Sequence, residues 1–195
     1  CCCSFDTGYG QDIAAPDMPD VDEYRKTPEF EKDRLAIARQ AIIGKLCLEI
    51  AGMELDMQQK ALDERLLLQT MMELWPEKTL DDCPQDFREA WLQSRKVFKM
   101  WLKDDNAWEE TEEGRDMVQQ LQDSMKRVEE KYGCQVLDQA ADKWLKTHGP
   151  VKKEGESPKE YLKRLNQLKE DIYSGKLAVS PELLHQEDEW KDEEE

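Results

Sequence analysis

Cysteine and histidine are the side chains of this sequence best suited to metal binding or nucleophilic chemistry, and the chain has six and two of them. The cysteines form a cluster at residues 1–3 and three widely spaced positions, Cys47, Cys83 and Cys134. No two of the spaced cysteines form a Cys-x-x-Cys pair, so the sequence predicts neither a zinc site nor a repeated disulfide framework. A single bridge between Cys83 and Cys134 is left open as an alternative for an oxidising compartment.

The spaced cysteines have different sequence surroundings. Cys47 lies between Leu46 and Leu48 within a helical pattern, so we expect a buried thiol that acts as a small hydrophobic residue. Cys83 precedes Pro84 at an expected helix start, where the helix dipole favours a thiolate.

The histidines and acidic residues form no recognisable catalytic motif. His148 and His185 have no second histidine or cysteine at ligand spacing. Carboxylates one turn apart, such as Glu109 and Glu113, are expected by chance in a chain with 45 acidic residues. A carboxylate-bridged metal site would also need a Glu-x-x-His motif, and glycine-rich phosphate loops and Gly-x-Ser-x-Gly turns are missing too. We therefore predict no catalytic residue, no metal site and no cofactor, and we do not expect an enzyme.

The net charge of the chain is −17. No basic excess is present to neutralise phosphates, so nucleic acid is not an expected partner. The same charge opposes unaided adhesion to anionic lipid, and no segment approaches the roughly 18 apolar residues of a membrane span. Residues 187–195 contain seven acids and are expected to form a solvated tail, with recruitment of a basic partner as the alternative.

The chain begins with Cys1, and residues 4–19 carry glycine, proline and acidic residues without apolar periodicity. A chain that begins at cysteine resembles a mature bacterial lipoprotein. The resemblance implies a lipid on Cys1, a flexible tether over residues 1–26, and a place in the bacterial cell envelope, facing the periplasm or the cell surface. One alternative is palmitoylation of Cys2 and Cys3 in a eukaryotic setting. Another is a cytoplasmic protein whose start at cysteine is accidental.

A long helix is predicted from Thr27, which supplies an N-cap before proline, to about Leu74. Apolar residues recur every three or four positions along it, as a buried stripe requires. The members of this stripe are Leu35, Ala38, Ile42, Leu46, Ile50, Met53 and Met57. A helix of about 48 residues would be about 70 Å long, so we expect a kink or break at Gly44 or Gly52.

Further helices follow the Trp-Pro pair at residues 75–76. A helix from Cys83 carries an aromatic stripe that we expect to form a core face. Its members are Phe87, Trp91, Ser94, Phe98 and Trp101. Thr111 caps the next helix, which Gly133 interrupts, and Ser157 opens a capping box for the last long helix.

These patterns predict an all-α fold without a sheet. We expect an irregular antiparallel bundle of long helices over residues 27–150, a short helical appendage over residues 151–186, and the acidic tail over residues 187–195.

A short segment is similar to a known family. Ala90-Trp91-Leu92 and Arg95 resemble the Ala-Trp-Leu-x-x-Arg segment of small helical lysozyme-inhibitor domains, although Lys99 stands where those domains have cysteine. We expect first a non-catalytic, membrane-tethered, exported protein that binds a protein partner or acts as a scaffold, and that reaches the membrane only through a lipid on Cys1. The alternative is a soluble helical adaptor or inhibitor, lysozyme-inhibitor-like, without lipid.

Overall fold

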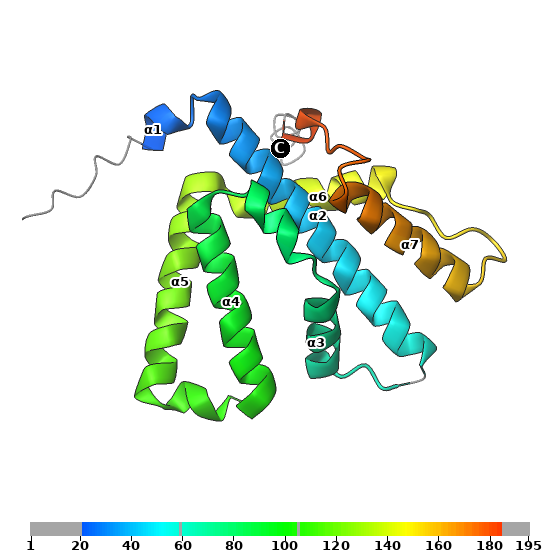
Figure 1. Ribbon diagram of the computed structural model, residues 1–195, viewed down its shortest axis with the longest axis horizontal. Coiled ribbons are helices and arrows are strands. Elements are labelled where there is room, and N and C mark those ends of the chain that lie inside the picture. The colour runs from blue at the N-terminus through cyan, green and yellow to red at the C-terminus, as the bar shows by residue number, and fades with distance from the viewer. Residues whose placement is uncertain (1–20, 59, 105, 185–195) are drawn as a thin grey trace, which may run out of the picture.

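The computed structural model describes residues 21–58, 60–104 and 106–184, which form helices and turns without a strand (Figure 1). The prediction of an all-α fold is confirmed. The α-helices are α1 (Val21–Tyr24), α2 (Pro28–Met57), α3 (Glu64–Leu74), α4 (Gln85–Asp104), α5 (Glu112–Tyr132), α6 (Cys134–His148) and α7 (Pro158–Tyr173). The 3-10 helices η1 (Glu77–Asp82) and η2 (Ala107–Glu110) precede α4 and α5.

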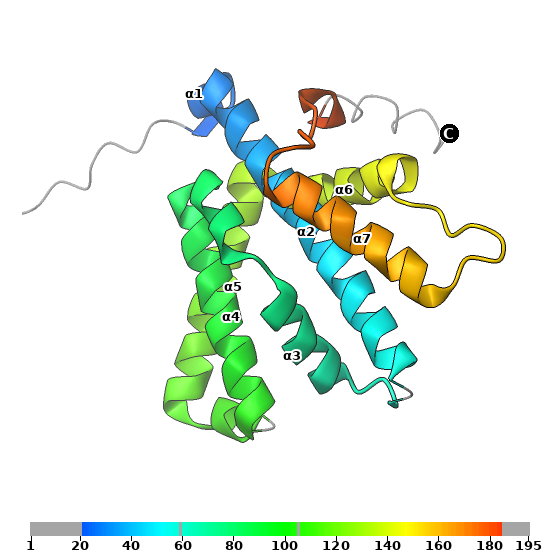
Figure 2. The ribbon, with the colours of Figure 1, turned by 45° about the vertical axis from the view of Figure 1, so that its right-hand side comes forward.

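α2 is the axis on which the fold is assembled. It contacts α3, α6 and α7, and Figure 2 shows it running between α3 and α7. The middle of its apolar stripe is buried as the spacing predicts, since Ile42, Leu46 and Ile50 have no exposed surface, whereas Met57 at its end is 41 % exposed. Ile43 and Cys47, on a neighbouring line of the helix, are equally buried. Because each buried aliphatic side chain contributes about 1.5–3 kcal/mol, this broad face of α2 is the main source of core stability.

The local signals that begin and end helices are where the sequence places them. The hydroxyl of Thr27 accepts the N–H of Phe30, and the hydroxyl of Thr111 accepts an N–H in the first turn of α5. Ser157 forms the expected capping box at the start of α7. Gly133 separates α5 from α6 with a φ of 68°, a left-handed conformation that glycine adopts without strain.

The expected break of the first helix lies elsewhere. α2 continues through Gly44 and Gly52, and the chain reverses only between the end of α2 and the start of α3. Asp63 then caps α3, because its carboxylate accepts the N–H of Arg65 at 2.8 Å. The reversal lets α3 pack back against α2, which a continuous helix could not do. The prediction of a break at Gly44 or Gly52 was therefore wrong.

Gly44 has a packing role instead. A Cβ at this position would overlap the ring of Trp75, so the missing side chain makes room for the indole. Trp75 is 8 % exposed, and its ring stacks on that of Trp91 in α4 with the centroids 4.6 Å apart. This stack attaches α4 to α2 through a tryptophan that belongs to neither helix.

α4 and α5 form a hairpin that extends away from α2 (Figure 1). At its tip, the carbonyl group of Trp108 in η2 approaches Gly114 too closely to leave room for a Cβ. At its base, Phe87 and Trp91 pack against the core that α2 organises. Farther along α4, Phe98 is 39 % exposed. The aromatic stripe of α4 is therefore a core face only in its first half, because the hairpin diverges from α2.

α7 belongs to the same core as α2. Leu165 and Ile172 are buried in it. Arg39 of α2 donates hydrogen bonds to the carbonyl oxygens of Ile172 and Tyr173, both at 3.0 Å. The helix of the appendage predicted over residues 151–186 therefore packs into the same core as α2.

α1 lies within the range predicted as a tether, yet its Tyr24 packs edge-on against Phe30 and Tyr132. The lipid site predicted at Cys1 and the acidic tail at residues 187–195 lie outside the described residues. Among the helices that the structure does describe, none combines the length and the apolar character needed to cross a membrane.

We expect Gly44→Ala to lower the free energy of unfolding by about 1–3 kcal/mol, because the added methyl group must displace the ring of Trp75. Gly52→Ala is the matched control, since a Cβ there meets nothing within 4 Å. The better helix propensity of alanine should raise stability at that position by up to about 1 kcal/mol. Urea denaturation measures both changes, and equal effects of the two substitutions would contradict the role of Gly44.

Candidate functional site

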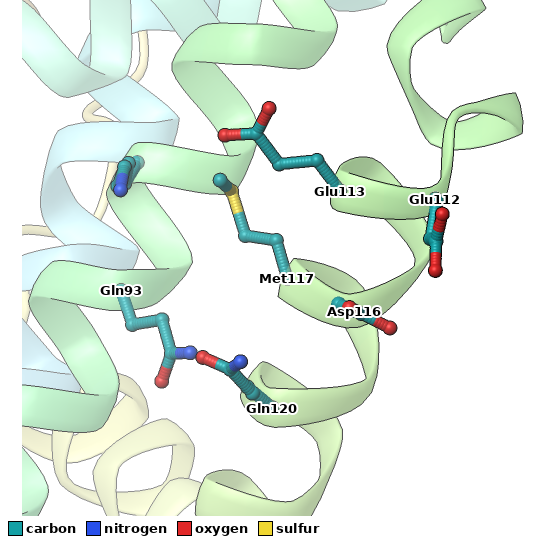
Figure 3. A pocket seen from close by; sticks show the side chains of 7 residues that line it. Gln93, Glu112, Glu113, Asp116, Met117 and Gln120 are labelled. Atoms are coloured by element: carbon teal, nitrogen blue, oxygen red, sulfur yellow. The ribbon is translucent and has the colours of Figure 1, made fainter. Parts of the chain in front are cut away.

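Two hollows of the described surface are bordered by α4. One lies between α4 and α5 and has a volume of about 630 Å³ (Figure 3). The other lies between α3 and α4 and has a volume of about 500 Å³. Both border the second half of α4, from residue 93 to residue 103.

The hollow between α4 and α5 is acidic, but its acids do not converge. Glu112, Glu113 and Asp116 come from the first turns of α5, where carboxylates interact favourably with the helix dipole. Figure 3 shows Glu113 and Met117 pointing toward α4, whereas Asp116 points away from it. Over the described residues, no three His, Cys, Asp or Glu side chains are grouped so that they could hold a metal ion. The helix dipole accounts for these acids without a ligand.

The hollow between α3 and α4, which we call the α3–α4 groove, has two walls of different chemistry. Its lining residues are Gln69, Met72, Glu73, Arg95, Lys99, Leu102 and Lys103. The α4 wall carries the three cations, whereas the α3 wall carries the one acid. Met72 and Leu102, one from each helix, are half-buried and give the groove apolar surface. This mixture of a charged wall and an apolar surface is typical of a protein-binding surface.

Arginine side chains hold the two walls together. Arg65 of α3 donates from Nη2 to the carbonyl oxygens of Trp101 at 3.0 Å and Leu102 at 3.3 Å. Arg95 of α4 donates from Nη2 to the carbonyl oxygen of Met72 at 3.0 Å. These acceptors lie in the last turns of α4 and α3, where carbonyl groups lack partners inside their own helix. Each arginine therefore completes the end of the opposite helix and fixes the separation of the walls.

Asp86 anchors the base of the hairpin. Its carboxylate accepts hydrogen bonds from Nζ of Lys131 and from the hydroxyl of Tyr132, both at 2.7 Å. Partial burial alone would raise the pKa of Asp86, but these hydrogen bonds outweigh it and hold the pKa below its ordinary value. Burial and the bond to Asp86 also raise the pKa of Tyr132. The start of α4 is thus fixed to the end of α5.

The spaced cysteines are free thiols in the structure, so Cys83 and Cys134 are not bridged. Cys47 is fully buried, as expected for a small hydrophobic residue. The prediction that Cys83 favours a thiolate was wrong. Its side chain is buried, and burial together with the carboxylate of Asp82 raises the pKa of the thiol to about 12. Desolvation therefore outweighs the helix dipole at this position.

Among the described residues, no histidine lies in a group of side chains that could form a metal or catalytic site. His148 ends α6, where its Nδ1 lies 3.1 Å from the carbonyl oxygen of Trp144 and its ring stacks on that indole. Both contacts are internal to α6 and give His148 a local structural role. His185 lies outside the described residues, as does Cys1.

The residues that resemble a lysozyme-inhibitor segment are used inside this fold. Ala90 is buried, Trp91 stacks on Trp75, and Arg95 binds the carbonyl of Met72. Packing within the chain therefore accounts for Ala90, Trp91 and Arg95, whereas Leu92 is 46 % exposed.

The α3–α4 groove was not among the sites predicted from the sequence, although two signals for it are present. Lys99 and Lys103 lie one helical turn apart, and the run Leu-Leu-Leu-x-x-Met-Met at residues 66–72 has more apolar residues than one helix face can bury. Asp63 before Glu64 is a local sign of a helix start, but the sequence does not show that the chain reverses before it and brings α3 beside α4.

The lowered pKa of Asp86 predicts a pH-dependent contribution to stability. Because this pKa is lower in the folded than in the unfolded chain, the contribution is complete above the unfolded value of about 3.9 and is lost as the pH falls below it. We expect Asp86→Asn to lower the free energy of unfolding at pH 7 by about 1 kcal/mol and to lose less stability than the wild type between pH 4 and pH 2.

Urea denaturation at pH 7, 4 and 3 measures this difference. Asp81→Asn is the control, because its ion pair with Arg88, at 3.4 Å, joins exposed side chains and should contribute about 0–0.5 kcal/mol. The role of Asp86 would be refuted by parallel pH profiles of the wild type and Asp86→Asn.

Comparison with protein-family models, with curated proteins and with solved structures finds no match to this chain. The function is therefore argued from the geometry of the α3–α4 groove and its surroundings.

Proposed function

We propose that this protein is a non-catalytic helical adaptor or scaffold, and that a partner protein docks at the α3–α4 groove. The observation that carries the proposal is the incomplete burial of α3. Six of its 11 residues are leucine or methionine, and all six are only half-buried. Each Å² of apolar surface removed from water contributes roughly 25 cal/mol of favourable free energy. A partner that packs on α3 would therefore be stabilised by covering apolar surface that the fold leaves in contact with water.

Other exposed apolar side chains lie near α3. Met57 ends α2 and is 41 % exposed, and Leu62 directly precedes α3 and is 57 % exposed. Figures 1 and 2 place the end of α2, the start of α3 and the end of α4 at the same end of the molecule. Single exposed apolar side chains are common on proteins, but Met57, at the end of α2, and Leu62, just before α3, add to the half-buried apolar surface of α3.

The proposal does not depend on the lipid predicted at Cys1. A partner can dock on α3 whether the chain is tethered in a cell envelope or is cytoplasmic, because the groove belongs to the folded part. The tether and the location therefore remain separate predictions from the sequence.

Site-specific photo-crosslinking tests the proposed docking site. The photoreactive residue p-benzoylphenylalanine replaces Leu62, Gln69 or, as the control, Val151, which is 75 % exposed and lies in the loop before α7. On irradiation of cells that make the full chain, we expect the same discrete adduct from positions 62 and 69 and none from position 151. No adduct, or the same adducts from all three positions, would overturn the proposal.

A further inference from the structure

The α4 wall of the groove carries positive charge that the described part of the chain does not neutralise. Lys99 and Lys103 are exposed, and neither has an ion pair or hydrogen bond with any described residue. Arg95, one turn earlier, is already engaged by the carbonyl of Met72 and by Glu77, whose Oε1 lies 2.6 Å from its Nη1. In a chain of net charge −17, these two neighbouring lysines, which pair with no described residue, offer positive charge to an acidic ligand.

The α3 wall of the groove carries the opposite charge. Glu73 of α3 lines the groove and accepts a hydrogen bond from the side-chain amide of Gln69 at 3.3 Å. The groove is therefore basic along α4 and weakly acidic along α3, with half-buried Met72 and Leu102 supplying apolar surface. An occupant that matches this pattern has an apolar face with acidic residues on one edge.

The form of the groove favours a helix over other ligands. Gln69, Glu73, Lys99 and Lys103 are exposed, so the groove is an open trough, whereas a small-molecule pocket buries most of its ligand. Its lining contains no aromatic residue, so the stacking surface required by proline-rich peptides is missing. The described chain also has no strand edge to accept an extended peptide. A trough between two antiparallel helices is suited to a third helix.

We propose that the α3–α4 groove binds an amphipathic helix of a partner protein, and that the edge of this helix facing α4 is acidic. This inference rests on the proposed function and adds the chemistry of the partner. Acidic residues at positions i and i+4 of a helix lie about 6 Å apart, which matches the one-turn spacing of Lys99 and Lys103. Leucine or methionine beside them covers Met72 and Leu102.

Selection of peptides on the intact protein tests the proposal, and the partner itself need not be identified first. The probe is an unbiased display library of helical peptides, each long enough for about five turns. We expect the enriched peptides to carry leucine or methionine at helical spacing and glutamate or aspartate along one edge. Their binding should weaken as salt rises, because the charges are exposed to solvent.

Charge reversal locates the binding site of the selected peptides. We expect K99E/K103E to raise their dissociation constants about tenfold or more, because attraction becomes repulsion at both positions. K152E/K153E is the matched control, with the same change in charge in the exposed loop before α7, and should leave the constants unchanged. Both variants alter exposed lysines only, and urea denaturation verifies that they fold.

Several results would overturn the acidic-helix assignment. They are failure to enrich any peptide, enrichment of neutral or basic peptides, and equal binding by K99E/K103E and the wild type. A chain ending at Leu184 lacks the acidic tail. If it bound the peptides tenfold more tightly than the full chain does, the acidic tail of this protein would be identified as the occupant instead, because its removal would free the groove. Binding of phosphatidylglycerol vesicles by the wild type but not by K99E/K103E would identify an anionic lipid surface.

The two proposals fail in different ways. Photo-crosslinks at positions 62 and 69 that persist in K99E/K103E would leave the docking function intact and overturn only the acidic partner. Absence of those crosslinks would overturn the docking function even if acidic peptides bind the isolated protein.

Discussion

The contact between Gly44 and Trp75 is the constraint on which the rest of the structure depends. The indole occupies the space that a side chain on α2 would fill, and Trp91 stacks on the same indole to bring α4 into position. Without this contact the hairpin of α4 and α5 would lose the stack of Trp91 on Trp75 and would keep the packing of Phe87, Val128 and Tyr132 and the polar anchor of Asp86 at its base. A residue of α2 that the groove does not contain therefore contributes to the position of its α4 wall.

Arginines provide a second, repeated means of assembly. Arg39, Arg65 and Arg95 each donate hydrogen bonds to carbonyl oxygens at the end of a different helix, respectively α7, α4 and α3. A planar guanidinium can reach two such acceptors and remain charged, which lysine does less well. Arginine thus stabilises helix ends within the fold, whereas the lysines on the α4 wall remain available for a partner.

The sequence predicts local structure here better than tertiary arrangement. The caps at Thr27 and Ser157 and the stop at Gly133 depend on neighbouring residues and are correct. The break after α2 is different, because Gly44 and Gly52 are local helix breakers whose effect tertiary packing overrides. The break occurs between α2 and α3, where a reversal allows α3 to cover α2, and the local signal near it is Asp63, the N-cap of α3.

The difference between local structure and tertiary arrangement also explains why the candidate site was not predicted. The absence of a catalytic motif could be read from the sequence, but the α3–α4 groove requires that residues 65 and 102, and 72 and 95, meet across two helices. At Cys83 the sequence suggests a chemical property that the folded structure does not support. Its position before a helix suggests an acidic thiol, whereas only the folded structure reveals the burial that raises its pKa.

The closed tip of the α4–α5 hairpin also affects the order of folding. Its contacts with η2 join residues close in sequence, and such contacts form faster than those between distant segments. Arg39 and Ile172, by contrast, are separated by most of the chain. The hairpin can thus form early, whereas the groove exists only once the hairpin has been placed beside α3. A partner that needs both walls therefore recognises the finished fold and bypasses chains that are still incompletely assembled.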